Sequence, residues 1–377
     1  MGNDQLQIET SLITDTAKLL DFQKNIESFL ASQPNPFLTF RFLLNTIEFY
    51  KSKREVPAII VYRFQNEIIG VAPILLRREL FFRIATSLPG YAYSPDFLFV
   101  SKFRDTLSEL TIDTLFDKLK CKLLLLYFPY ESPTNRSIQA IAKKHNLLLR
   151  QTTNEYQCHN VIEVNKSWEE FEKIRGSGLR RKFRVFERKL NNYGEWTINF
   201  TKFDDNNRQD IANKIYEIEK MSWKEVWRKQ RGIIDNKLSW ILESAASSNE
   251  DQQLIVRVCF LNLNHRNIAY CLYLQFRERA YIAKTSFAEI YRRLYPGIFL
   301  NNEVVKDLFL NRTVKQIDWM TNLDFNRNWP SNRHIRVRYL ISQGMIAYGI
   351  LTIIKFKRLF IKQNSGKILK KVYRPLS

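Results

Sequence analysis

Residues 279–320 read RAYIAKTSFAEIYRRLYPGIFLNNEVVKDLFLNRTVKQIDWM, and this stretch decides the fold that we predict. It opens with an apolar run, Arg279–Phe287, that is typical of a strand. Pro296-Gly297 then marks the start of a helix, because proline fits the first helical turn. The short apolar run Val314–Trp319 is typical of a buried strand. A strand, a helix and a second strand in succession indicate an α/β fold.

The same order of elements occurs twice along the chain. Two further apolar runs, Gln253–Leu263 and Asn267–Phe276, precede residue 279 and complete a predicted antiparallel meander. The first part of the chain repeats this order with three predicted strands, a helix and a buried strand: Ala58–Phe64, Ile68–Arg77, Phe81–Thr86, Asp105–Lys120 and Lys122–Phe128. The repeated order predicts two α/β lobes that are joined near residue 160.

These elements predict three parts of the chain. Residues 1–160 form an N-terminal lobe, and residues 161–340 form a C-terminal lobe. We expect each lobe to contain a mixed, mostly antiparallel sheet flanked by helices. Residues 341–377 are predicted to form a basic helix and tail.

The composition favours a folded protein of a reducing compartment. Of the 377 residues, 45% are apolar and 26% are charged, which excludes wholesale disorder. The four cysteines lie far apart and the four histidines are scattered, so we predict neither a disulfide framework nor a metal site. The N-terminus lacks the basic and then apolar pattern of a secretory signal. We therefore expect a cytoplasmic protein.

The positive charge is concentrated in the second part of the chain. The formal net charge is +21, and about +18 of it falls after residue 160. No acidic residue follows Asp324, whereas twelve lysines and arginines do. Such an excess implies an anionic partner, which can be a nucleic acid, an acidic membrane surface or a phosphate-bearing ligand.

A basic helix is the first candidate binding element. Between Leu179 and Leu190, four apolar residues recur on one helical face, and six basic residues cover the rest. We select Arg180 and Arg184 as candidate substrate-binding residues. The alternative is a solvated helix face without a ligand.

The junction before the predicted helix at Pro296 is the second candidate. Arg292 and Arg293 come just before Tyr295, and Gly297 lets a ligand approach the backbone. Free N–H groups at such a junction can bind pyrophosphate. The alternative is an ordinary turn.

The end of the last predicted strand is the third candidate. Asp318 and Asp324 lie at and beyond its carboxyl end, where ligand sites of α/β sheets gather. Asp324 can equally cap a turn.

Several short motifs together resemble a known family. They are Ser167–Phe171, the basic helix through Leu190, Tyr295–Gly297, the stretch from Asp318 through Arg327 to Trp329, and, in the first lobe, Pro36-Phe37 and Ile69–Ile74. Their order and spacing over roughly residues 30–335 resemble the BioF2-like, cellulose-biosynthesis-type acetyltransferases of the GNAT superfamily. Where the family pattern has Gly-x-x-Tyr-Lys, this chain has Leu323–Arg327.

The resemblance implies two tandem GNAT-like lobes and transfer of an acyl group from acyl-coenzyme A to an amine. The amine would belong to a small molecule or a cell-envelope or polysaccharide precursor. The coenzyme would bind at Arg292, Arg293, Tyr295, Gly297, Ile298 and Phe299, and the substrate at Arg180, Arg184, Asp324 and Arg327. Such a reaction needs a base and an acid. From their placement, Glu289 and Asp318 are candidate bases, and Tyr281 and Tyr291 are candidate acids.

Two other functions fit the same residues. The double-lobed fold is also used by Fem-type transferases that take an amino acid from aminoacyl-tRNA, and the basic lobe would then bind RNA. Alternatively, the chain is a degenerate GNAT-like protein that binds nucleic acid or an anionic membrane. Residues 351–377 carry eight basic residues and no acid, so this tail could rest on the inner face of a membrane.

Overall fold

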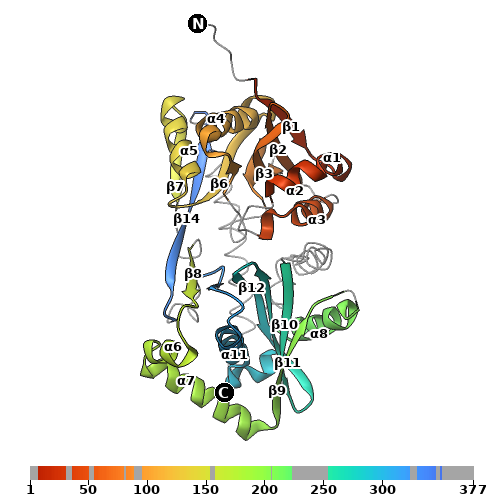
Figure 1. Cartoon of the computed structure of the whole chain (residues 1–377), viewed down its shortest axis with the longest axis vertical. Coiled ribbons are helices and arrows are strands. Elements are labelled where there is room, and N and C mark those ends of the chain that lie inside the picture. Colours follow the sequence, from red (N-terminus) through yellow and green to blue (C-terminus); the bar gives the residue numbers. More distant parts are fainter. Residues whose placement is uncertain are drawn as a thin grey trace.

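The computed structural model describes residues 7–30, 36–50, 55–79, 82–88, 96–152, 158–204, 206–222, 254–322, 329–344 and 349. Its strands form one continuous fourteen-stranded sheet in which the principal order is β1-β2-β3-β4-β6-β14-β8-β13-β12-β11-β10-β9. We call residues 7–152 the N-terminal half and residues 158–344 the C-terminal half. Figure 1 shows the two halves stacked along the long axis of the molecule.

The N-terminal half contains seven strands with helices on both faces. Its elements are β1 (Glu9–Ile13), α1 (Thr16–Asp21), α2 (Gln23–Leu30), η1 (Pro36–Leu38), α3 (Phe40–Tyr50), β2 (Glu55–Phe64), β3 (Glu67–Glu79), β4 (Phe82–Ser87), β5 (Leu98–Phe99), η2 (Ser101–Phe103), α4 (Arg104–Asp113), the π-helical turn η3 (Thr114–Lys118), β6 (Cys121–Pro129), α5 (Pro133–Lys144) and β7 (Leu148–Thr152). Helices α4 and α5 cover one face, and α1 to α3 cover the other.

The C-terminal half repeats much of this arrangement. Its elements are β8 (Cys158–Glu163), α6 (Trp168–Ile174), α7 (Ser177–Tyr193), β9 (Trp196–Lys202), α8 (Arg208–Lys220), β10 (Leu254–Leu263), β11 (Arg266–Phe276), β12 (Arg279–Phe287), η6 (Glu289–Leu294), α11 (Pro296–Asn311), β13 (Gln316–Asp318) and β14 (Asn332–Ser342). Helices α6, α7 and α11 cover one face of the sheet, and α8 covers the other. The predicted mixed, mostly antiparallel α/β architecture is confirmed.

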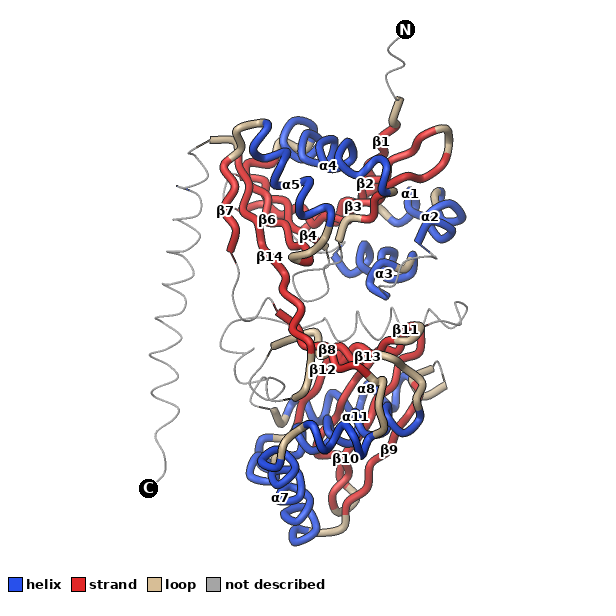
Figure 2. The backbone as a smooth tube through the Cα atoms, turned by 60° about the vertical axis from the view of Figure 1, so that its left-hand side comes forward, coloured by secondary structure: helices blue, strands red, loops and turns tan. Residues whose placement is uncertain are grey.

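One strand of the C-terminal half, β14, extends into the sheet of the N-terminal half. Residues 332–335 of β14 pair with β8, whereas residues 336–342 lie between β6 and β7 of the N-terminal half. Strand β8 also pairs with β13, within the C-terminal half. Both views show β14 running from one half into the other (Figures 1 and 2). The predicted boundary at residue 160 falls inside β8, and the division into lobes stays a prediction.

The structure differs from the prediction at the start of the C-terminal helix predicted from residue 341. Ile341 and Ser342 end strand β14 and do not begin a helix, because Val337, Tyr339 and Ile341 alternate toward the core with the period of a strand. Residues 345–348 and 350–377, which include most of the predicted basic helix and tail, lie outside the described residues.

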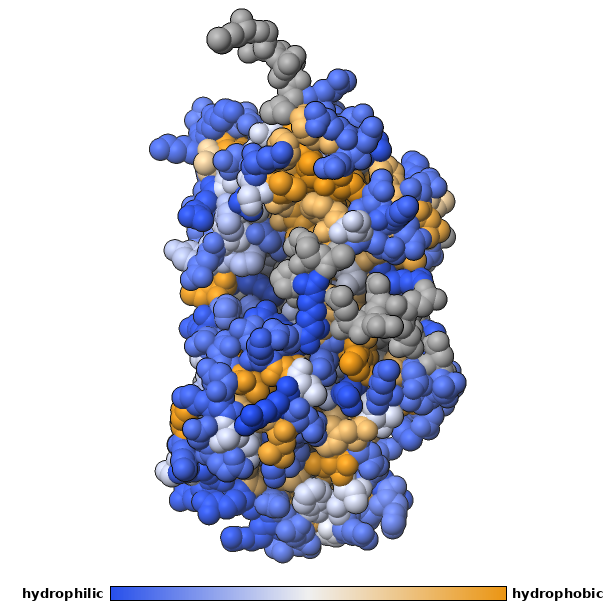
Figure 3. Space-filling model, viewed as in Figure 1, coloured by the Kyte–Doolittle hydropathy of each residue, from blue (hydrophilic) through white to orange (hydrophobic). Residues whose placement is uncertain are grey.

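Helix α7 forms where the spacing of its apolar residues predicts a helix. Phe183, Phe186 and Leu190 are buried in the core beneath α6, α7 and α11. Its basic residues face outward, and the surface over α6 and α7 is largely hydrophilic at the lower left of Figure 3. Within the part of the chain that the structure describes, no helix has the length and apolarity needed to cross a membrane.

Candidate functional site

The site begins where two parallel strands separate. Strands β12 and β13, which α11 connects, pair from Arg279 with Gln316 to Tyr281 with Asp318. Strand β13 ends there, whereas β12 continues to Phe287. The pairing of β12 with β11 is irregular just beyond Tyr281, and such bulges are common beside active sites. Tyr281 and Asp318 thus lie at the point of separation.

A cavity of about 450 Å³ lies next to this point, between the two halves. The N-terminal half contributes Asp96, Tyr130 and Glu131 to its wall. The C-terminal half contributes a polar patch from four neighbouring strands: His159 of β8, Arg279 and Tyr281 of β12, Asp318 of β13, and His334 and Arg336 of β14. We call this cavity the inter-half cavity. Strands β8 and β14 supply half of the patch.

A buried histidine and a buried carboxylate form the centre of the patch. His159 Nδ1 lies 2.7 Å from Asp318 Oδ1, and the same oxygen accepts a hydrogen bond of 2.7 Å from the Met320 N–H. Burial alone would raise the pKa of Asp318, but the charges of His159, Arg279 and Arg336 and the hydrogen bond from His159 lower it overall. Asp318 is therefore ionised at neutral pH, and the proton of this hydrogen bond belongs to His159 Nδ1. That assignment leaves His159 Nε2 to exchange protons with a ligand.

The groups around this pair are cationic or protonated. Burial lowers the pKa of Arg336, but an arginine keeps its charge in a protein. The Arg279 guanidinium lies 5.7 Å from the centre of the Tyr281 ring. Burial raises the pKa of Tyr281 to about 12, so its hydroxyl holds its proton at neutral pH. The cavity therefore combines a histidine–carboxylate pair, a hydroxyl donor and three guanidinium groups, and the carboxyl groups of Asp96, Glu131 and Glu163 also line it.

His334 lies at the edge of the patch. Its ring centre is 5.3 Å from that of His159, across the paired strands β8 and β14. Burial and the charge of His159 lower the pKa of His334. The neutral form of His334 is therefore favoured beside the other histidine.

The predicted coenzyme residues gather at the start of α11. Tyr295 caps the helix with a left-handed backbone (φ 57°), and its ring stacks on Phe186 of α7. Helix geometry leaves the N–H groups of Gly297 and Ile298 without an intrahelical acceptor. A Cβ atom added at Gly297 would lie 3.1 Å from the Phe287 ring, so glycine permits this close packing.

Charge surrounds this helix start. Arg292 and Arg293 are exposed, and Lys189 Nζ lies 3.1 Å from the Arg293 carbonyl and 4.8 Å from the centre of the Tyr295 ring. These cations and the two N–H groups fit an anionic group such as a pyrophosphate. Phe299 does not add a donor, because its N–H bonds to the Tyr295 carbonyl and its side chain packs on Trp196.

Two predicted catalytic residues lie apart from the histidine–carboxylate pair. Glu289 Oε1 pairs with Arg292 at 3.1 Å, in η6. Tyr291 packs against the core beneath α11, and its ring lies 5.9 Å from that of Tyr193. Neither residue lines the inter-half cavity.

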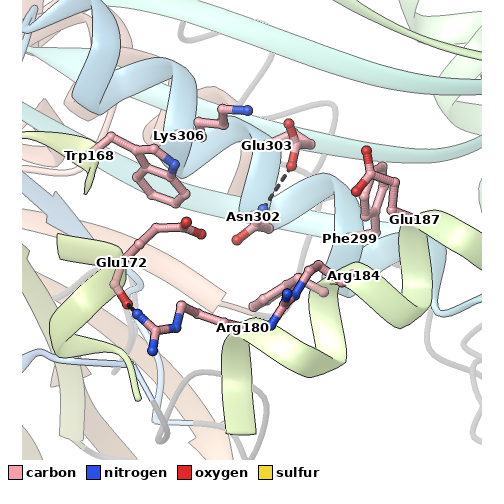
Figure 4. Close-up of a pocket in the computed structure, with 10 residues that line it drawn as sticks. Trp168, Glu172, Arg180, Arg184, Glu187, Phe299, Asn302, Glu303 and Lys306 are labelled. Atoms are coloured by element: carbon pink, nitrogen blue, oxygen red, sulfur yellow. Dashed lines mark hydrogen bonds between the residues drawn. The ribbon is translucent and has the colours of Figure 1, made fainter. Parts of the chain in front are cut away.

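The predicted substrate residues divide into two groups. Arg180 and Arg184 line a second cavity between α6, α7 and α11, shown in Figure 4, and do not reach the inter-half cavity. Asp324 and Arg327 lie outside the described residues. Among the residues that are described, no group of three or more histidine, cysteine or acidic side chains could hold a metal ion.

Sequence reasoning missed His159, Arg279, His334 and Arg336 as site residues. His159 and Asp318 are brought together only by the pairing of β8 with β13, which nothing in the local sequence indicates. A weaker signal existed for β14, because apolar and basic residues alternate from Ile335 to Tyr339.

Comparisons with known proteins agree with this architecture. Residues 177–327 match the family model described as "Acetyltransferase (GNAT) domain". The match covers β12, α11 and β13, which surround the point of strand separation. No curated protein matches the chain. These findings support a transferase of the GNAT type, whereas the finer BioF2-like resemblance stays a prediction.

Three solved structures are similar in fold. A conserved protein of unknown function from Bacteroides thetaiotaomicron is 13% identical with a TM-score of 0.56, over 89% of this chain and 100% of that one. The C-terminal domain of a putative lysylphosphatidylglycerol synthetase from Agrobacterium fabrum is 12% identical with a TM-score of 0.54, over 92% and 97%. FemX is 10% identical with a TM-score of 0.55, over 88% and 96%. At these identities the similarity concerns the fold alone.

Proposed function

We propose that this protein is an N-acyltransferase that moves an acyl group from an acyl-coenzyme A thioester to an amine. The observation that carries the proposal is the His159–Asp318 pair at the point where the parallel strands β12 and β13 separate. The family match over residues 177–327 supports the reaction class. The acceptor would be a small molecule or a cell-envelope or polysaccharide precursor, in a cytoplasmic protein that can rest on the inner face of the membrane.

Each polar residue of the inter-half cavity has its own role in the proposed acyl transfer. The amine nitrogen attacks the thioester carbonyl carbon, and His159 Nε2 accepts the proton that the amine loses. Asp318 holds the imidazole in the required tautomer and stabilises the cation that forms, so it is a positioning residue. As the carbon–sulfur bond breaks, the Tyr281 hydroxyl is placed to return a proton to the thiolate. Arg279 and Arg336 stabilise negative charge that develops at the carbonyl oxygen.

The start of α11 would hold the pyrophosphate of the coenzyme. The N–H groups of Gly297 and Ile298, together with Arg292, Arg293 and Lys189, supply donors and positive charge there. The helix dipole adds to the positive potential.

Steady-state thiol release tests the proposal. The full chain is mixed with acetyl-, succinyl- or palmitoyl-coenzyme A and a panel of amines, including glucosamine and amino acids, and free thiol is measured. We expect release that requires both substrates, and His159→Gln should lower kcat by about a hundredfold or more. His145→Gln is the matched control, because His145 also pairs with a carboxylate, Glu109, at 2.5 Å and lies on the surface of the N-terminal half.

Two results would overturn the proposal. The first is amine-dependent transfer from aminoacyl-tRNA with none from any thioester, which would assign a Fem-type donor. The second is full activity of His159→Gln with a thioester, which would remove the histidine–carboxylate pair from the reaction.

A further inference from the structure

A second cavity, of about 490 Å³, lies between α6, α7 and α11. It is on the opposite face of the sheet from the inter-half cavity. Ala280 and Ile282 of β12 belong to the core beneath α11, whereas Tyr281 between them points to the other face. The proposed acyl transfer uses none of the charged residues that line this second cavity.

Six charged side chains line the cavity, three of them basic and three acidic. They are Arg180, Arg184 and Lys306, and Glu172, Glu187 and Glu303. The described residues provide one ion pair for this set, a contact of 3.5 Å between Glu172 and Arg175. Arg180 donates to the backbone carbonyl of Glu172 at 3.3 Å. The other charges face the cavity without an ion pair to a described side chain, although partners of opposite sign line the same space.

Acceptor groups converge on one side of this cavity. The Glu172 carboxylate and the amide of Asn302 point toward one another in Figure 4. Asn302 is 5% exposed and donates its amide N–H to Glu303 at 2.7 Å, so its Oδ1 faces the cavity as an acceptor, and this buried oxygen has no hydrogen-bond partner. Burial raises the pKa of Glu303. A buried acceptor without a donor is unfavourable, and a ligand with N–H donors would relieve this cost.

The other side of the cavity supplies donors. Arg180 and Arg184 are one helical turn apart on α7. Figure 4 shows the Arg180 guanidinium turned toward Glu172, to whose backbone carbonyl it donates at 3.3 Å, so Arg184 is the principal partner for an anionic group. Guanidinium groups bind carboxylates with two parallel hydrogen bonds. Trp168, Phe183 and Phe299 provide apolar wall between the two sides.

We propose that this cavity binds a small zwitterion, an amino acid or short peptide with a free ammonium and a free carboxylate group. The ammonium would lie between Glu172, Asn302 Oδ1 and Glu303, and the carboxylate against Arg184 and Arg180. A cavity of this volume lies within the range of small-molecule sites. The inference does not rest on acyl transfer, because it concerns the other face of the sheet.

Isothermal titration of the full chain with three matched peptides tests the proposal. Glycylglycine carries both charges, N-acetylglycylglycine lacks the ammonium, and glycylglycinamide lacks the carboxylate. We expect glycylglycine to bind with a Kd below about 10 mM, and each blocked peptide to bind at least tenfold more weakly.

Two variants locate the binding. Arg184→Gln should weaken the binding of glycylglycine at least tenfold and remove the preference for a peptide with a free carboxylate. Glu172→Gln should remove the preference for a free ammonium. Arg181→Gln and Glu169→Gln are matched controls on the same helices, because both residues are exposed and neither lines the cavity.

Arg184 is exposed at the cavity rim, so Arg184→Gln should fold even if Glu172→Gln, which breaks the contact with buried Arg175, does not. Equal binding of the three peptides, no binding of glycylglycine, or binding that Arg184→Gln leaves unchanged would each overturn the proposal. The measurement needs no acyl donor, so its outcome is independent of the proposed acyl transfer.

Discussion

Asp318 shows how single residues define the candidate site. Its carboxylate is buried, which opposes ionisation, yet His159, Arg279 and Arg336 lower its pKa overall. One of its oxygens accepts hydrogen bonds from both His159 and Met320. Asp318 therefore fixes the histidine ring and the chain direction just beyond β13 at the same time.

The pH dependence of stability tests this role. Asp318→Asn should lower the free energy of unfolding at pH 7 by about 1.5–3 kcal/mol, the range for hydrogen bonds to a charged group. Because the folded-state pKa lies below the unfolded value of about 3.9, this stabilisation is complete above about pH 4. It is lost as the pH falls through the folded-state pKa. Urea unfolding of both proteins between about pH 7 and pH 3 measures the difference, which should shrink in acid.

The matched control is Glu109→Gln, because Glu109 also pairs with a histidine but on the surface. Its effect should stay within about 1 kcal/mol, as for exposed ion pairs. A difference between wild type and Asp318→Asn that stays constant down to about pH 3 would contradict an ionised Asp318.

Part of the site could be predicted from residues alone. Asp318 and Tyr281 were selected from their places on strands, and both line the inter-half cavity. His159 and Arg336 could not be selected in this way, because the residues that they contact lie on strands that are distant in sequence. Local patterns specify the direction of a side chain relative to its own strand, whereas strand pairing decides what it meets.

At the scale of elements, α11 contributes to both proposed binding sites, the coenzyme site at its start and the second cavity. Its first turn lies beside the cations of η6 and α7, and its middle lines the second cavity. The sequence predicted this helix because Pro296 marks its first turn. Strand β14 was missed, although apolar and basic residues alternate from Ile335 to Tyr339 as in a half-buried strand.

Charge removal at the start of α11 should weaken donor binding. Arg292→Ala with Arg293→Ala should raise KM for acyl-coenzyme A about 5–30-fold, which corresponds to about 1–2 kcal/mol for two exposed charges. The effect should diminish as salt is added. Thiol release at low and moderate ionic strength measures it.

Arg312→Gln provides the matched control, because Arg312 is exposed at the opposite end of the same helix. An unchanged KM in the double variant would show that the donor does not contact this junction.

At the scale of the whole molecule, strand β14 joins both halves into one sheet. Residues 336–342 of β14 lie between β6 and β7, so the C-terminal half cannot leave without opening the N-terminal sheet. All seven tryptophans come after residue 160. The four that the structure describes, Trp168, Trp196, Trp319 and Trp329, belong to or pack against the core beneath α6, α7 and α11, so their fluorescence reports on the C-terminal half.

A substitution in the N-terminal core should move this fluorescence signal. Ile60 is fully buried on β2, and Ile60→Ala should cost about 2–5 kcal/mol. If the halves unfold together, the urea midpoint of the tryptophan transition falls although none of the four described tryptophans belongs to the N-terminal half. Lys143→Ala, at an exposed position of the same half, should leave the midpoint unchanged. An unshifted midpoint in Ile60→Ala would show that the halves unfold independently.

The position of β14 also sets an order of events during synthesis. The position between β6 and β7 stays empty until β14 has been translated as far as residue 342, roughly 190 residues after β7 is complete. At 5–20 residues per second, the ribosome needs about 10–40 s for that length. During this interval the nascent chain carries an open, apolar strand edge at β6, which is the kind of surface that chaperones bind.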